Sequence, residues 1–143
     1  MIKKLQTITY LFKAHSALSQ HIKKSLENTD FNLNEFAVME ALYTHENLTP
    51  RAIVDKILIP NSSLSYVLEQ LYKKELITYT IDQKDKRVRH YTLSEKGKRL
   101  FPSVYQHHYN YMNDLINEGL NEEELATLHT LLKKLGYHAE RSL

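Results

Sequence analysis

Basic side chains concentrate between positions 84 and 89, where four of the six residues are Lys84, Lys86, Arg87 and Arg89. Ammonium and guanidinium groups at this spacing neutralise phosphate groups, so the segment predicts contact with a polyanion such as a nucleic acid. An ordinary solvated basic surface is the alternative interpretation of the same charges. The secondary structure expected around the segment distinguishes the nucleic-acid contact from the ordinary basic surface.

The net charge of the whole chain conceals this concentration. The 143 residues sum to +2 at neutral pH. Residues 51–100 carry eleven basic and six acidic side chains, residues 1–50 carry five of each, and residues 101–143 carry three basic against six acidic. The positive charge therefore falls in the middle third of the chain, where a surface for a polyanion is expected.

A second polar group precedes the basic segment. Ser62, Ser63 and Ser65 lie at the start of an amphipathic segment, with Tyr66 beside them. Hydroxyl groups donate and accept hydrogen bonds, so these serines can contact base edges or phosphates. The alternatives are that the serines only start a helix and that Tyr66 packs on its own helix.

Other chemistries are excluded or not expected. The chain has no cysteine, which excludes disulfides, thiolate zinc sites and a thiol redox switch. It has no Gly-rich phosphate loop, nucleophile elbow or metalloprotease helix motif, so an enzyme is not expected. His107 and His108 point about 100° apart on a helix, so no metal site is expected. No apolar run of about 18 residues occurs, and a cytoplasmic protein is expected.

The elements that position these residues are expected to be mostly helices. The chain has only 3 Gly and 3 Pro, which favours long helices with few turns. Apolar residues at steps of three and four predict a first helix over about 2–26, and a capping box of Asn32 and Glu35 begins the second. Thr49 followed by Pro50 starts a short helix to about residue 58.

The next helix should present the serines. Asn61 caps it, and its buried stripe is formed by Leu64, Val67, Leu68 and Leu71. Two short helices joined by a tight connection, the second with a small polar exposed face, are typical of a helix-turn-helix.

After residue 76 the apolar period changes from 3.6 to 2. Residues 77–82 and 88–93 are expected to form two strands around a polar turn, and the four basic side chains lie at the tip of this hairpin. Ser94 then caps a helix over about 95–117, and Asn121 begins a last helix that Gly136 closes. The predicted fold class is mainly α with a small β-hairpin, arranged as a winged helix-turn-helix.

The segment from Asp85 to Gly97, DKRVRHYTLSEKG, resembles the wing signature of the MarR family of transcriptional regulators. Leu48-Thr49-Pro50 and residues 71–77 are also similar to the landmarks of that family's helix-turn-helix, and the resemblance covers essentially the whole chain. The sequence departs from the family pattern at three positions: Ser94 replaces Thr, Glu75 replaces the Gly that commonly ends the recognition helix, and Tyr66 replaces an Arg.

The resemblance implies a homodimer that binds double-stranded DNA. Residues 1–30 and 100–143 would form long dimerisation helices, and residues 31–99 would form the DNA-binding domain. Two winged helices would then meet successive major grooves of a pseudo-palindromic operator. The chain is expected to act as a repressor, with an activator as the alternative.

The DNA-binding residues follow from this arrangement. Arg87 is expected in the minor groove, and Asp85 is expected to hold it through an ion pair. The full expected set is Ser62, Ser63, Ser65, Tyr66, Lys73, Lys84, Asp85, Lys86, Arg87 and Arg89.

The resemblance also suggests a small aromatic effector, bound between the dimerisation helices and the winged helix. Its expected lining residues are Phe12, Tyr43, Tyr105 and Tyr109, although aromatic residues at helical spacing also build ordinary cores. Two alternative functions stay open: a zinc-responsive regulator of the same fold, and a winged helix used for protein or RNA contacts.

Overall fold

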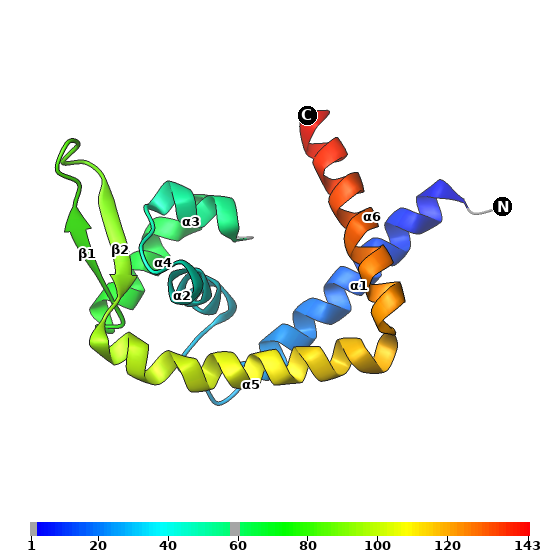
Figure 1. Cartoon of the computed structure of the whole chain (residues 1–143), viewed down its shortest axis with the longest axis horizontal. Coiled ribbons are helices and arrows are strands. Elements are labelled where there is room, and N and C mark those ends of the chain that lie inside the picture. Colours follow the sequence, from blue (N-terminus) through cyan, green and yellow to red (C-terminus); the bar gives the residue numbers. More distant parts are fainter. Residues whose placement is uncertain (1–2, 58–60) are drawn as a thin grey trace. The chain divides into compact units, whose positions relative to one another are not determined.

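The computed structural model describes residues 3–57 and 61–143, without the side chains of residues 61 and 62. The chain divides into two units, residues 1–108 and residues 109–143, and each is described by itself. In chain order the described elements are α1 (Lys4–Ser25), α2 (Leu33–His45), α3 (Pro50–Lys56), α4 (Asn61–Lys73), β1 (Ile77–Ile81), β2 (Arg89–Leu93), α5 (Glu95–Gly119) and α6 (Glu122–Arg141). The predicted class, mainly α with one small hairpin, is confirmed (Figure 1).

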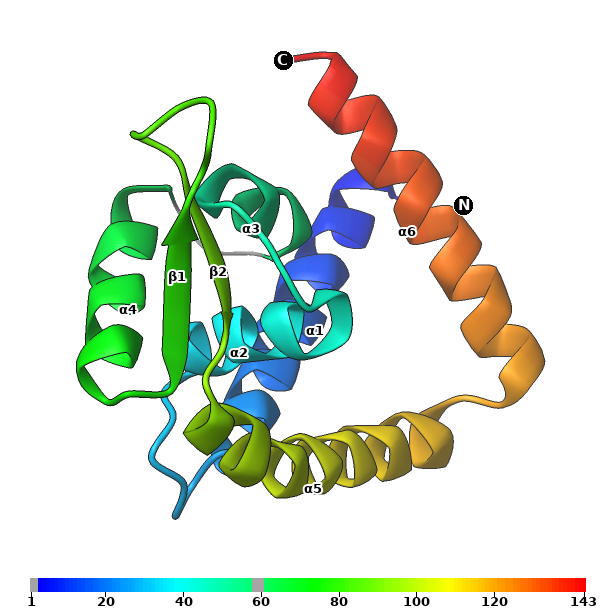
Figure 2. The same cartoon turned by 60° about the vertical axis from the view of Figure 1, so that its left-hand side comes forward.

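The first unit has its core where α2, α3 and α4 meet the hairpin and the start of α5. Phe36, Met39, Ile53, Leu71 and Phe101 are almost completely removed from solvent there. Figure 2 shows the hairpin running alongside α4, with the turn between the strands extending beyond the ends of α3 and α4. Burial of these large apolar side chains is what fixes α4 and the hairpin relative to each other.

The predicted helix starts are confirmed by their hydrogen bonds. Asn32 and Glu35 form a reciprocal capping box at α2, and Asn121 and Glu124 form another at α6. The Thr49 hydroxyl accepts from the Ala52 N–H at 3.3 Å at the start of α3. Residues 58–60, where the end of this short helix was expected, lie outside the described residues.

The hairpin is antiparallel, and Tyr79 pairs with Tyr91 near its centre. The second strand begins at Arg89, one residue later than the alternation predicts, and the Val88 N–H donates to the Asp85 carbonyl in the turn instead. Leu48 adds an isolated bridge to Tyr91 through two backbone hydrogen bonds. These bonds tie the segment before α3 to β2.

The terminal helices differ from the core in their exposure. Only Ser25 is buried among the described residues of α1, and no residue of α6 is buried. The last helix does not close at Gly136, as the sequence predicted, but continues to Arg141. Gly136 does not adopt a positive φ, so it forms no left-handed cap. Among the described residues, no helix is both long and apolar enough to cross a membrane.

Candidate nucleic-acid interface

Helix α4 presents a polar face opposite its buried stripe. Leu64, Val67, Leu68 and Leu71 are buried as predicted. Ser65 is exposed, Tyr66 is 66% exposed, and Ser63 is half-buried. The side chain of Ser62 lies outside the described part of the chain. A helix face of this size with small hydroxyls and one phenol can enter a major groove.

Lys73 at the end of α4 has a partner within its own helix. Its ammonium lies 3.2 Å from the carboxylate of Glu69, and both side chains are well exposed. Exposed pairs of this kind hold only weakly, by about 0.3–0.5 kcal/mol, so Lys73 can leave Glu69 for a phosphate.

The turn of the hairpin, residues 82–88, is called the wing here, and Asp82 organises its first half. One carboxylate oxygen of Asp82 accepts the backbone N–H groups of Lys84 at 3.0 Å and Asp85 at 2.9 Å. The other oxygen lies 2.8 Å from Nε2 of His90. The hydrogen bond to His90 and the two backbone N–H groups lower the pKa of Asp82. The roles of Asp82 and His90 were not predicted from the sequence, although an aspartate opening a polar turn is a signal for this geometry.

Asp85 organises the second half of the wing. Its carboxylate accepts the backbone N–H of Arg87 at 3.0 Å and two guanidinium N–H groups of Arg87 at 3.1 Å each. These bonds lower the pKa of Asp85 and raise the pKa of Arg87. The expected Asp85–Arg87 ion pair is therefore present. The Arg87 side chain stays 90% exposed while its backbone N–H and its guanidinium are held by Asp85.

The other basic residues of the hairpin are also exposed. Lys84 and Lys86 project from the wing, and Arg89 lies on β2 with its guanidinium carbon 4.2 Å from the centre of the Tyr79 ring. The wing and the start of β2 thus carry four exposed basic side chains within six consecutive residues, at the end of the hairpin where the sequence predicted them.

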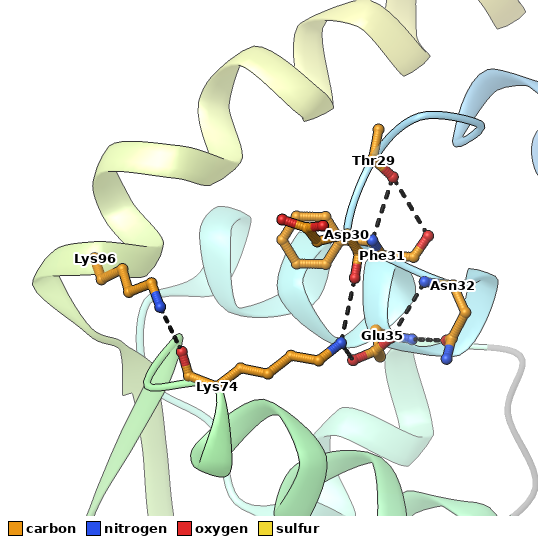
Figure 3. A network of polar contacts seen from close by, with 7 residues as sticks. All are labelled: Thr29, Asp30, Phe31, Asn32, Glu35, Lys74 and Lys96. Atoms are coloured by element: carbon orange, nitrogen blue, oxygen red, sulfur yellow. Dashed lines mark hydrogen bonds and ion pairs between the residues drawn. The ribbon is translucent and has the colours of Figure 1, made fainter.

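The last turn of α4 is held by a network of ions and carbonyl groups that the sequence did not reveal (Figure 3). The Lys74 ammonium lies 2.6 Å from the buried carboxylate of Glu35 and donates to the Asp30 carbonyl at 3.2 Å. Lys96 of α5 donates to the Lys74 carbonyl at 2.9 Å. The second oxygen of Glu35 accepts the Asn32 N–H, so the capping box of α2 and the end of α4 share one carboxylate.

The chain leaves α4 through a left-handed residue. Glu75 has φ of 62°, its N–H donates to Tyr72, and the Leu76 N–H donates to Leu71. This pair of bonds is a Schellman motif, formed here without the usual glycine. Ser94 donates to the Glu75 carbonyl at 2.6 Å and accepts the Gly97 N–H at 3.0 Å, which confirms its capping role.

Gly97 lets α5 approach this exit. A Cβ at position 97 would collide with the carbonyl oxygen of Leu76, so only glycine permits the contact. The start of α5 therefore packs directly against the backbone of Leu76, just after the end of α4.

The residues expected to line an effector pocket lie in different surroundings. Tyr43 and Tyr105 pack against Phe101 and against each other, with the Tyr43 and Tyr105 ring centres 5.2 Å apart. Phe12 is 67% exposed on α1 and Tyr109 is 52% exposed on α5. The clustering of Tyr43 with Tyr105 around a core phenylalanine is the ordinary packing that sequence analysis weighed as the alternative.

A separate hollow of about 360 Å³ lies between α1, α2, α3 and α5 in the first unit, lined by residues that include Ile22, Phe36, Glu40, Thr44, Lys56 and His108. His108 packs against Phe36 with the rings tilted by 53° and their centres 4.5 Å apart, and its Nδ1 lies 2.8 Å from the Ser25 hydroxyl. That hydroxyl donates to the Ile22 carbonyl at 2.7 Å, so the hydrogen of the contact belongs to His108. Burial lowers the pKa of His108, helped by nearby His107, and burial raises the pKa of Glu40.

Within residues 3–57 and 61–143, no group of three or more histidine, aspartate or glutamate side chains is arranged to hold a metal ion.

The MarR family model matches residues 31–88, from the capping box of α2 to the wing. The HTH-type transcriptional regulator MhqR of Bacillus subtilis is 31% identical over 139 residues, which are 97% of this chain and 95% of that protein. The uncharacterised HTH-type regulator YkoM of the same organism is 30% identical over 92% of this chain and 84% of its own length.

Solved structures show the same fold. AbsC, a MarR family transcriptional regulator from Streptomyces coelicolor, superposes with a TM-score of 0.85 at 17% identity, over 98% of this chain and 97% of AbsC. A mutant MarR from E. coli complexed with operator DNA gives a TM-score of 0.79 at 19% identity, over 94% of this chain and 99% of that one. With the match to MhqR extending over nearly the full length of both proteins, the chain belongs to the MarR family: it is a DNA-binding transcriptional regulator and not an enzyme.

Proposed function

We propose that the protein is a repressor that binds a pseudo-palindromic operator as a homodimer. The observation that carries the dimer is the apolar stripe of α6. Leu125, Leu128, Leu132 and Leu135 recur at steps of three and four and are 36–47% exposed, although leucines at this spacing normally face a partner. A second copy of the chain offers the same stripe, and closed twofold pairing is the commonest way to cover it.

The polar face of α4 and the wing are the proposed DNA contacts. Ser62, Ser63, Ser65 and Tyr66 would read the major groove, and Arg87 would enter the minor groove beside it. Lys73, Lys84, Lys86 and Arg89 would neutralise phosphates. Two such surfaces in one dimer would occupy neighbouring turns of a promoter and exclude the polymerase.

An electrophoretic mobility shift with the DNA upstream of the protein's own gene tests this function. Selective binding that survives excess random-sequence duplex, and whose affinity falls steeply with added salt, is expected. A winged helix used for protein or RNA contacts would instead show no preference for any duplex. A flat salt response would remove the basic middle third as the DNA surface.

The hollow beside His108 is the proposed site for a small aromatic effector that relieves repression. Its size suits a single substituted ring, and its wall combines Phe36 with the polar groups of Glu40, Thr44 and Lys56. Phe12, Tyr43, Tyr105 and Tyr109 remain the alternative lining. Ala37 also lines the hollow, and the larger side chain of Ala37→Leu would fill part of it. This variant should keep DNA binding and lose its sensitivity to phenols and benzoates. If phenols and benzoates raise the melting temperatures of the wild type and of Ala37→Leu equally, the hollow is not the effector site.

A further inference from the structure

A second hollow lies on the DNA side of the molecule, between α4 and the hairpin. It has a volume of about 380 Å³, and its wall includes Ser65, Glu69, Tyr72, Tyr79, Arg89 and Tyr91. The exposed hydroxyl of Ser65 belongs to the proposed reading face of α4, so a duplex seated on that face passes this hollow. Among the described residues of its wall, Arg89 is the one arginine.

Arg89 is held by rings and not by a carboxylate. Its guanidinium carbon lies 4.2 Å from the centre of the Tyr79 ring, and a side-chain hydrogen bond with Tyr91 helps to raise its pKa. A neutral ring orients the cation and leaves its charge uncancelled. Arg87 is the opposite case, since its guanidinium is bound by two oxygens of the Asp85 carboxylate. Of the two arginines, Arg89 therefore offers the stronger unpaired charge to an anion.

The rings under Arg89 also join the two DNA-binding elements. Tyr72 of α4 lies with its ring centre 5.3 Å from that of Tyr79 on β1, and Tyr79 lies 5.6 Å from Tyr91 on β2. Tyr79 is half-buried and Tyr91 is buried, so this cluster of tilted rings is part of the fold and not a loose surface contact. A guanidinium that packs on the cluster is fixed relative to α4 as well as to the two strands.

The remaining charge on the wall does not oppose an anion strongly. Glu69 is the acidic side chain there, and it lies 3.2 Å from the Lys73 ammonium. The Lys73 charge stays within about one helical turn of Glu69 whether it contacts that carboxylate or a neighbouring phosphate. The two charges therefore nearly cancel at the hollow, which leaves Arg89 to set the sign of the local potential.

We propose that this hollow binds one phosphate group of the DNA backbone through Arg89, and that Tyr79 is the positioning residue for that arginine. The proposal rests on the proposed function, because it places the duplex on α4 and the wing. The contact carries no sequence information. It fixes how far α4 enters the groove while the serines and Arg87 read the bases.

The experiment measures the affinity of the full chain for two duplexes of equal length, the upstream DNA and a scrambled sequence, at several salt concentrations. Arg89→Ala should weaken binding to both duplexes by about fivefold per bound protomer at 0.15 M salt, because one fewer counterion is released. The slope of log affinity against log salt should fall by about one per protomer. Lys98→Ala removes an exposed positive charge from α5, outside the hollow, and should leave the slope unchanged.

Substitutions that remove or keep the aromatic ring test whether Tyr79 positions Arg89. Tyr79→Leu should reproduce the loss of Arg89→Ala and add nothing in the Arg89→Ala background, whereas Tyr79→Phe keeps the ring and should bind like the wild type. A purely structural role for Tyr79 would give additive losses and a lower melting temperature that follows the affinity.

Three results would overturn the phosphate site: an unchanged salt slope in Arg89→Ala, a loss confined to the upstream duplex, or additive losses for Tyr79→Leu. The proposed function fails separately, if the wild type binds both duplexes equally. In that case a reduced slope for Arg89→Ala still supports the phosphate site.

Discussion

The Arg87 side chain is 90% exposed, yet its backbone N–H and its guanidinium are both bound by Asp85. In the proposed complex, this arrangement would place the arginine in a narrow groove without a large loss of side-chain entropy on binding. Arg87→Ala should weaken binding to the upstream duplex about tenfold and leave the melting temperature unchanged. Fluorescence anisotropy at matched salt measures the affinity, and Lys98→Ala controls for the lost charge. Equal affinity of Arg87→Ala and wild type would remove Arg87 from the interface.

His108 links stability to pH. Its pKa in the folded chain is lowered by burial and by His107, so the unfolded chain binds a proton more readily. The free energy of unfolding should therefore be highest above the ordinary pKa of histidine, about 6.5, and should fall as the pH drops through that value toward the folded pKa. The slope from this one group cannot exceed about 1.4 kcal/mol per pH unit.

Urea unfolding at pH 7.5 and pH 5.5 measures this dependence, with His108→Asn as the comparison because its amide can still donate to Ser25. The stability of the variant should fall less between the two pH values than that of the wild type. The same drop in wild type and His108→Asn would show that His108 is not the source of the pH dependence.

At the residue scale, the sequence predicted contacts between near neighbours and missed those between distant ones. Asp85 and Arg87 are two positions apart, so their ion pair could be inferred from spacing alone. Glu35 and Lys74 are 39 positions apart, and Ser25 and His108 are 83 apart. These pairs form only because the core brings α2 to α4 and α1 to α5, which no local pattern encodes.

Among the elements, α4 depends most on how it ends. Its Schellman motif places Glu75 at φ of 62°, where a side chain crowds the following carbonyl. Glu75→Gly should raise the free energy of unfolding by about 0.5–1 kcal/mol, because relief of the left-handed strain exceeds the added entropy of the unfolded chain. Thermal unfolding followed by circular dichroism measures the change.

A matched control for this prediction is Glu46→Gly, since Glu46 also has φ of 62° but follows α2. Both variants should gain stability. A loss in Glu75→Gly alone would mean that the Glu75 side chain contributes more than its backbone strain costs.

Helix starts were predictable because capping residues act within four positions, as Asn32, Thr49 and Asn121 show. Helix ends were less so. Gly136 is a normal stop signal, but α6 continues through it at a cost of about 1 kcal/mol relative to alanine. The cap instead forms at Ser142, whose N–H donates to carbonyls of the last turn. Local signals state where a helix can end, and the rest of the helix decides whether it does.

For the molecule as a whole, the fold class and the winged helix-turn-helix followed from periodicity and the wing motif, because these patterns reflect one buried core. The hollow at Tyr79 and Arg89 did not, since its wall comes from helices and strands that meet only in the folded chain. The large-scale feature still to be tested is the partner of the terminal helices, whose apolar residues were predicted to be interface residues and are exposed in the single chain.

The dimer prediction concerns the leucine stripe of α6. Replacing Leu128 and Leu132 with arginine places two like charges against the same stripe of a second copy, so the pair should dissociate. Light scattering should give twice the chain mass of 16.9 kDa for the wild type and the mass of one chain for the double variant. Operator affinity should fall about a hundredfold or more, because one half-site no longer holds the other protomer nearby. Thr130 lies on the opposite face of α6, so the variant Thr130→Arg should remain dimeric. If Thr130→Arg and the double leucine variant are both dimers, or both monomers, the interface does not run along this stripe.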